Sequence, residues 1–134
     1  MDKHLGALDR LLKALADPTR LRIVGLLQSG EVCVCNIHES LNIPQPKASR
    51  HLAYLRRAGV VQTEKRGLWV HYRLTPQSDA VAQTILDTVR HGVTHLATVN
   101  KDAARLERST GCLPDSRAVS PMPCCGDAAS KRKP

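Results

Sequence analysis

The chain has 134 residues, the size of one domain, and a formal net charge of +8. A small basic domain suits nucleic acid, because lysine and arginine neutralise phosphates and release counterions. Phenylalanine is absent, and the aromatic residues are Tyr54, Trp69 and Tyr72. This argues against single-stranded DNA or RNA as the ligand, since those are usually bound on aromatic stacking platforms.

The sequence shows no sign of export. Met1-Asp2-Lys3-His4 leads into an amphipathic segment instead of the apolar region of a signal peptide, and no apolar run approaches the length of a membrane span. We therefore expect a cytoplasmic protein with no membrane partner. In that compartment its five cysteines are expected to be thiols, not structural disulfides.

Two helices are expected at the N-terminus. Residues 2–16 place leucines at helical spacing, with charged residues elsewhere on the surface. Asp17 and Pro18 have the residue types of an N-cap and a first helical position, so they predict the start of a second helix. This helix should end near Ser29-Gly30.

Cys33 and Cys35 precede a third expected helix. Asn36 and Glu39 are spaced as a capping box, which predicts that this helix begins at Asn36. In an extended segment before it, the two cysteine side chains point to the same side, whereas inside a helix residues i and i+2 lie about 200° apart. We therefore expect one thiophilic ion to reach both sulfurs and to pull on the start of the helix.

A basic helix follows after a tight turn. We expect it from Pro46 to about Ala58, with Gly59 as its C-cap. A helix, a tight turn and a second helix with polar residues at its front form the spacing of a DNA-reading helix-turn-helix. The predicted DNA contacts on this helix are Gln45, Lys47, Ser49, Arg50 and His51.

A β-hairpin is expected next. Residues 60–64 and 68–74 are rich in β-formers and are joined by Lys65-Arg66-Gly67. Two consecutive cations at the tip, Lys65 and Arg66, suit a wing that lies on phosphates or enters the minor groove.

The pattern then predicts one long helix from about Gln77 to Arg105, with an apolar stripe over several turns. We expect it to pair with a second copy, alongside the first helix, so that a dimer places two reading helices about one DNA turn apart. Residues 1–108 thus form one mainly α (α+β) domain, a winged helix-turn-helix with long N- and C-terminal dimerisation helices. Residues 109–134 are expected to form a flexible basic tail that carries Cys112, Cys124 and Cys125.

Four stretches of the sequence, in their order along the chain, resemble the ArsR/SmtB family of bacterial metalloregulators, and the resemblance covers roughly residues 5–100. They are residues 16–23, 31–37, 49–61 and 67–74. Within that family the chain is similar to the arsenic-responsive repressors, whose Cys-Val-Cys before the reading helix binds trivalent arsenic or antimony. The resemblance implies a homodimer that represses an arsenic-resistance operon from a palindromic operator on double-stranded DNA and leaves it when As(III) or Sb(III) binds.

By this resemblance, Cys33 and Cys35 are metalloid ligands. Many of these sensors have a third cysteine three residues after the second, and this chain has His38 there. The tail cysteines Cys112, Cys124 and Cys125 are therefore candidates for the third thiolate, from either subunit, or for a separate site.

Alternative functions use the same thiols differently. A redox sensor would oxidise them, and a sensor of another thiophilic metal would bind a different ion. No enzyme is expected, because Cys33-Val34-Cys35 lacks the Cys-x-x-Cys spacing of thiol reductases and no βαβ pattern surrounds it. No organic cofactor is expected either.

Overall fold

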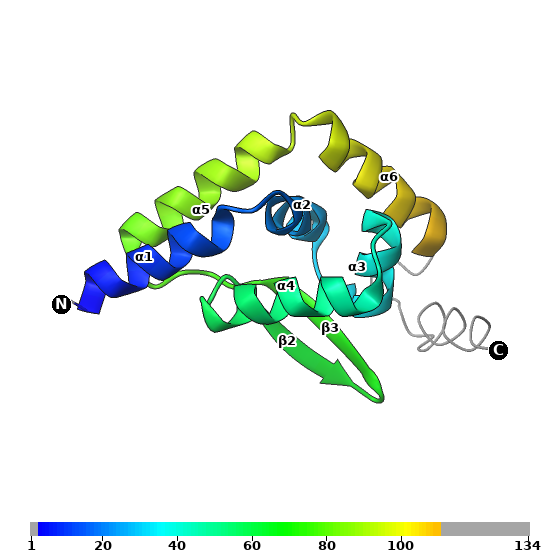
Figure 1. Cartoon of the computed structure of the whole chain (residues 1–134), viewed down its shortest axis with the longest axis horizontal. Coiled ribbons are helices and arrows are strands. Elements are labelled where there is room, and N and C mark those ends of the chain that lie inside the picture. Colours follow the sequence, from blue (N-terminus) through cyan, green and yellow to red (C-terminus); the bar gives the residue numbers. More distant parts are fainter. Residues whose placement is uncertain (1–2, 111–134) are drawn as a thin grey trace.

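The computed structural model describes residues 3–110 of the chain. The elements in chain order are α1 (Lys3–Leu15), α2 (Pro18–Leu26), a 3-10 turn η1 (Leu27–Ser29), β1 (Val32–Cys33), α3 (Val34–Leu41), α4 (Gln45–Arg57), β2 (Val61–Arg66), β3 (Trp69–Leu74), α5 (Ala80–Val93) and α6 (Ala97–Thr110). The helices surround α2, and the β2–β3 hairpin projects away from them (Figure 1). This arrangement confirms the predicted mainly α, winged helix-turn-helix fold.

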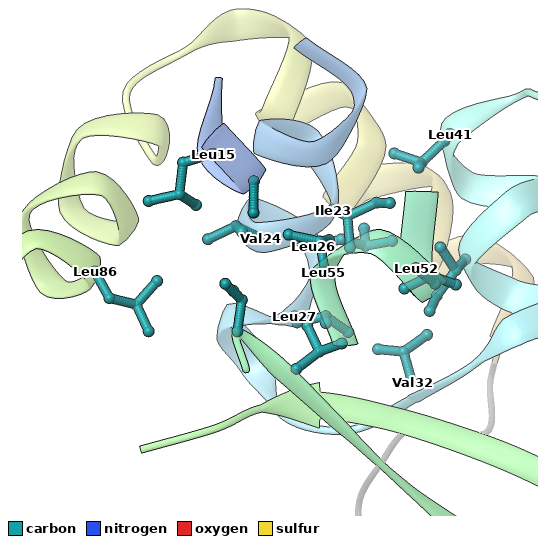
Figure 2. Close-up of a cluster of buried hydrophobic side chains, with 14 of the residues drawn as sticks. Leu15, Ile23, Val24, Leu26, Leu27, Val32, Leu41, Leu52, Leu55 and Leu86 are labelled. Carbon is teal, nitrogen blue, oxygen red and sulfur yellow. The ribbon is translucent and has the colours of Figure 1, made fainter. Parts of the chain in front are cut away.

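Helix α2 is the centre of the packing and contacts α1, α3, α4, α5 and α6. Its start is as predicted: the Asp17 carboxylate accepts hydrogen bonds from the amides of Thr19 and Arg20 at 2.9 and 3.1 Å, and Pro18 occupies the first turn. The core around it is aliphatic, with Ile23 and Val24 fully buried beside leucines from α1, α4 and α5 (Figure 2).

Helices α3 and α4 form the helix-turn-helix. Asn42 ends α3 in the left-handed conformation with φ 59°, and Pro44 is the N-cap of α4. Helix α4 begins at Gln45, one residue earlier than predicted. It ends in a Schellman motif, in which the Val60 amide bonds to the Leu55 carbonyl at 2.9 Å and Gly59 has φ 79°.

The predicted start of α3 is wrong. The helix begins at Val34 with Cys33 as its N-cap, so Cys35 lies in the first turn and Asn36 is buried inside the helix instead of capping it. The residues just before this start, Val32 and Cys33, pair with β3. Within the helix, Ile37 and Leu41 lie one turn apart and are both buried in the core.

The hairpin is present, but its predicted tip is wrong. Lys65 and Arg66 belong to β2, and a two-residue turn of Gly67 and Leu68 joins the strands, since Arg66 pairs with Trp69. Gly67 has φ 65°, a conformation that glycine adopts without strain and that two-residue hairpin turns require. Strand β3 is central in the sheet, whose order is β1-β3-β2.

The prediction of a single long C-terminal helix is also wrong, because a turn at residues 94–96 divides this segment into α5 and α6. Each of these residues donates its amide to a carbonyl three residues earlier, and the Thr94 hydroxyl donates to the His91 carbonyl at 2.7 Å. Helix α6 then folds back onto α2 and α3 (Figure 1). Val99 packs so close to Gly25 that a Cβ there would lie 2.6 Å from its Cγ1. Leu86, Val93 and Val99 of the predicted apolar stripe are therefore buried within one chain, whereas Val81 and Leu96 remain exposed.

Among residues 3–110, none of the helices combines the length and the apolar character that crossing a lipid bilayer requires.

Candidate functional site

The outer face of α4 presents an exposed polar surface at its N-terminal half. Gln45, Lys47, Ser49 and Arg50 are all exposed, while Ala48, Leu52 and Leu55 are fully buried against the core. The buried face fixes α4 on the domain and leaves the front of the helix open. This is the placement from which a recognition helix contacts base edges in the major groove.

His51 lies differently from the other predicted DNA contacts. Its Nδ1 is 3.1 Å from an Nη of Arg20 and 3.8 Å from Oδ2 of Asp17, so the ring faces α2. Burial lowers the pKa of His51, and the positive charges of Arg20, Lys47 and Arg50 act in the same direction, against Asp17. Because a guanidinium only donates, Nδ1 accepts, and the ring is neutral in this arrangement.

The wing carries Lys65 and Arg66 on strand β2, where successive side chains point to opposite faces. Lys65 is exposed. Arg66 instead forms an ion pair with Glu31 at 2.8 Å and lies 3.7 Å from Glu64. Leu68, at the turn, is 83% exposed and forms the tip of the wing.

The two predicted metalloid ligands converge at the start of α3. Cys33 Sγ lies 3.3 Å from Cys35 Sγ, a separation that one ion can bridge with metal–sulfur bonds of about 2.3 Å. The sulfurs converge for a reason that the sequence did not indicate. Cys33 is the N-cap with extended backbone, φ −75° and ψ 145°, so the 200° rotation between helical positions i and i+2 does not apply.

Cys33 is disulfide-bonded in this structure, which contradicts the expectation that all five cysteines are thiols. The pair formed by Cys33 and Cys35 is connected to the wing through the sheet. Cys33 pairs directly with His71 of β3, and the preceding residue Val32 pairs with Tyr72. Directly opposed residues on antiparallel strands share a face, so His71 flanks Cys33. Burial lowers the pKa of His71; Glu31 opposes this and Arg66 adds to it. Together with the Glu31–Arg66 ion pair, these contacts join the residues before α3 to the hairpin.

The other end of α3 is held by an ionic cluster around the buried carboxylate of Asp102, which we call the α3 clamp: Arg22, Asp102 and Arg105. Arg22 donates to both carboxylate oxygens of Asp102 at 2.8 and 2.9 Å, and Arg105 donates to Oδ1 at 2.8 Å. The same two arginines donate to the carbonyls of Leu41 and Ser40. Hydrogen bonding to Asp102 raises the pKa of Arg22 against the effect of burial.

His38 occupies the place of the family's third cysteine and faces the turn of the helix-turn-helix. Its Nδ1 lies 3.2 Å from the carbonyl oxygen of Ile43 and therefore carries the hydrogen. Within residues 3–110, no three His, Cys, Asp or Glu side chains converge into a metal-binding group. The remaining predicted ligands, Cys112, Cys124 and Cys125, lie outside the described residues.

Sequence reasoning missed the α3 clamp and Arg20, although each had a signal. Val99, Asp102 and Leu106 are spaced by three and four residues, so a carboxylate stands on the apolar stripe of α6. A charge in such a position is rarely buried without a partner. For Arg20 the signal was weaker, since an arginine near an N-cap is usually an ordinary surface residue.

Comparisons with known proteins agree with this geometry. Residues 17–63 match the family model described as "Bacterial regulatory protein, arsR family". The arsenical resistance operon repressor of Escherichia coli (strain K12) is 53% identical over 79 residues, which cover 58% of this chain and 68% of that protein. The arsenic resistance transcriptional regulator ArsR1 of Pseudomonas putida is 37% identical over 119 residues, covering 85% and 84% of the two chains.

A solved structure shares the fold. The homodimeric winged helix-turn-helix DNA-binding domain Mb0332 from Mycobacterium bovis is 27% identical, with a TM-score of 0.57. The match covers 68% of this chain and 82% of that domain. The similarity therefore extends well beyond the helix-turn-helix itself.

Proposed function

Because the chain belongs to the ArsR family of bacterial regulatory proteins, and is a DNA-binding transcriptional repressor and not an enzyme, we propose that its inducer is trivalent arsenic or antimony. The proposal rests on one observation above the others: Cys33 Sγ and Cys35 Sγ lie 3.3 Å apart at the N-cap of α3. Soft thiolates select thiophilic ions, and these stand at the start of the helix-turn-helix. The protein would act in the cytoplasm, where its operator lies.

The DNA-bound form in this proposal is a homodimer on a palindromic operator. Large apolar side chains remain exposed near α1 and α5 within one chain, and these support a subunit interface: Leu5, Leu12, Val81 and Leu96. A two-fold dimer places two copies of α4 about one DNA turn apart. Gln45, Lys47, Ser49 and Arg50 would then contact bases and phosphates, and Lys65 of the wing would contact the backbone.

Two thiolates do not complete the site, because trivalent arsenic prefers three. We propose that the tail supplies the third sulfur from Cys112, Cys124 or Cys125. Helix α6 packs against α3 and ends at Thr110, two residues before Cys112, so the tail leaves the fold from an element in contact with the thiol helix. A separate site made by the three tail cysteines is the alternative arrangement.

Release follows from the position of the thiols. Cys33 belongs both to β1 and to the N-cap of α3, so drawing Cys33 and Cys35 together toward a third sulfur would distort the start of α3 and displace α4. To shift a population from 1:99 to 99:1, a ligand must prefer the released state by about 5.5 kcal/mol.

A second function, a thiol-based redox sensor, uses the same short Sγ–Sγ separation. Oxidation of the two thiols would join them and distort α3 in a similar way. The two functions differ in their trigger, so a single set of titrations separates them.

The experiment is a fluorescence-anisotropy titration of a palindromic operator with the reduced protein, followed by arsenite under reducing, oxygen-free conditions. We expect release near one equivalent of arsenite per subunit and none with zinc. Cys33→Ser and Cys35→Ser should bind the operator within about twofold of the wild type and ignore arsenite. Release of either variant at wild-type arsenite concentrations would exclude these ligands.

Single variants of the tail cysteines, each to serine, identify the third sulfur. The variant that lacks it should need about a hundredfold more arsenite for release, which corresponds to a loss of about 2.7 kcal/mol. Full response in all three variants would contradict a tail ligand. A complex that ignores arsenite but dissociates with peroxide, and recovers with a thiol reductant, would favour the redox sensor.

A further inference from the structure

Arg20, on α2, caps the end of α1. Its Nε donates to the carbonyl oxygen of Ala14 at 2.7 Å, and an Nη donates to that of Lys13 at 3.3 Å. The last carbonyls of a helix lack partners within it, and a cation there also complements the helix dipole. One side chain therefore fixes where α1 ends relative to α2.

The same guanidinium holds α4. Its Nη1 donates to His51 Nδ1 at 3.1 Å, and its Cζ lies 4.0 Å from the centre of the Tyr54 ring, within the range of a cation–π contact. Asp17, whose carboxylate caps α2, lies 3.8 Å from the same His51 nitrogen. Arg20 thus contacts two carbonyl groups of α1 and two side chains of α4.

These two side chains lie beside the residues of α4 that the proposed function assigns to DNA contact. Lys47 and His51 are four residues apart, as are Arg50 and Tyr54, so the four share one side of the helix. Lys47 and Arg50 are exposed at the front of that side, and Arg20 holds its rear half. The contact that Arg20 makes therefore sets the rotation of α4 about its own axis.

The apolar core cannot set that rotation as sharply. Ala48, Leu52 and Leu55, on the neighbouring side of α4, are completely buried, but apolar burial is non-directional. A guanidinium presents its donors in a rigid planar fork and also stacks on aromatic faces. Small rotations of α4 that leave the three apolar side chains buried would still break the contacts of Arg20.

We propose that Arg20 is a positioning residue for DNA recognition, one that fixes the rotation of α4 relative to α1. The proposal rests on the homodimer proposed above, in which the exposed side chains of Leu5 and Leu12 assign α1 to the subunit interface. In such a dimer, a rotation of α4 about its own axis moves Lys47 and Arg50 of each copy, and so changes the separation at which the two copies meet the operator. Arg20 therefore determines the preferred distance between half-sites.

The test uses Arg20→Lys, which keeps the charge and loses both the planar fork and the stacking surface. Operators whose half-sites are separated by successive single base pairs are titrated with the full chain. The wild type should prefer one spacing. Arg20→Lys should lose about tenfold in affinity at that spacing and much less at its neighbours, so that the preference flattens. Arg10→Lys, at an exposed position of α1, is the matched control and should keep the wild-type profile.

A structural role alone would give a different result. If Arg20→Lys weakened binding equally at every spacing, in parallel with a lower melting temperature, the positioning role would be overturned. A double variant, Arg20→Lys with Tyr54→Leu, tests whether Arg20 acts through its contact with the Tyr54 ring. Because each substitution breaks that same contact, their effects on affinity should be clearly less than additive. Strict additivity would contradict an action of Arg20 through α4.

The dimer itself is checked by sedimentation of the wild type. A monomer with no preferred spacing would contradict the proposed homodimer, and the role of Arg20 is then read on a single half-site. There, Arg20→Lys should still alter the base preference at the positions contacted by Lys47 and Arg50. An unchanged base preference would overturn the positioning role independently of the dimer.

Discussion

The two ends of α3 are held in opposite ways. At the C-terminal end, Asp102 is fully buried between Arg22 and Arg105, and those arginines donate to the last carbonyls of the helix. At the N-terminal end, no side chain caps the helix. The strand before it consists of two residues, and its nearest ion pair, Glu31 with Arg66, is partly exposed.

This difference indicates which end can respond to a ligand. A buried carboxylate with two guanidinium partners has no alternative arrangement of similar energy, because any separation leaves a charge buried and unpaired. The thiol end has a short strand, a partly solvated ion pair and two sulfurs that lie close together. Under the proposed function, a ligand at Cys33 and Cys35 would therefore move the start of α3 about a fixed C-terminal end.

The largest effect is expected from breaking the fixed end. Asp102→Asn keeps the side-chain volume but leaves Arg22 and Arg105 without their counter-charge. Losing one partner of a fully buried pair costs about 3–5 kcal/mol, and because the Arg22 and Arg105 side chains are 23% and 35% exposed, we expect the lower end, about 3 kcal/mol or less. We expect the free energy of unfolding, measured by urea titration, to fall by this amount. The matched control is Asp9→Asn, because Asp9 forms an exposed pair with Lys13 at 3.2 Å. Its cost should be about 0.5 kcal/mol or less, and equal losses for the two variants would remove the distinction between the ends.

A much smaller effect is expected at the responsive end. Glu31→Gln removes the charge opposite Arg66, whose side chain is 52% exposed, so solvent screens the pair and the loss of unfolding free energy should be about 0–1 kcal/mol. The variant should release the operator at arsenite concentrations equal to or below those of the wild type, since it loosens the segment before Cys33. A stability loss as large as that of Asp102→Asn would show that both ends are held equally.

Local signals in the sequence predicted the fold well where one segment determined its own structure. Asp17-Pro18 identified the start of α2, and Gly59 identified the end of α4. The errors arose where distant residues decide. The capping pattern of Asn36 and Glu39 predicted a helix start at Asn36, but the pairing of Val32 and Cys33 with β3 is followed by a helix that starts at Val34. The apolar stripe of residues 81–99 predicted one continuous helix and did not indicate the turn at Thr94. In both places tertiary packing overrode a local preference.

The candidate site was predictable in its residue types and not in its connections. The proximity of Cys33 and Cys35 and the exposed front of α4 could be predicted from spacing, whereas the ligand role proposed for the two cysteines came from the family resemblance. The partners of His51 and Arg66 could not, because Arg20 and Glu31 are 31 and 35 residues away. The same holds for Arg22 and Asp102, which are separated by 80 residues. Periodicity assigns a residue to a face of its own helix, but it does not say which charge from another element lies opposite.

Amide hydrogen exchange along α3, measured by NMR with and without one equivalent of arsenite, tests the contrast between the two ends most directly. The amides of Ile37 and His38 bond to carbonyls of the first turn, whereas those of Asn42 and Ile43 close the C-terminal end. We predict that arsenite accelerates exchange at Ile37 and His38 about tenfold and leaves Asn42 and Ile43 within about twofold, with no change in Cys33→Ser. An equal change at both ends, or a change confined to Asn42 and Ile43, would contradict a fixed clamp and a responsive thiol end.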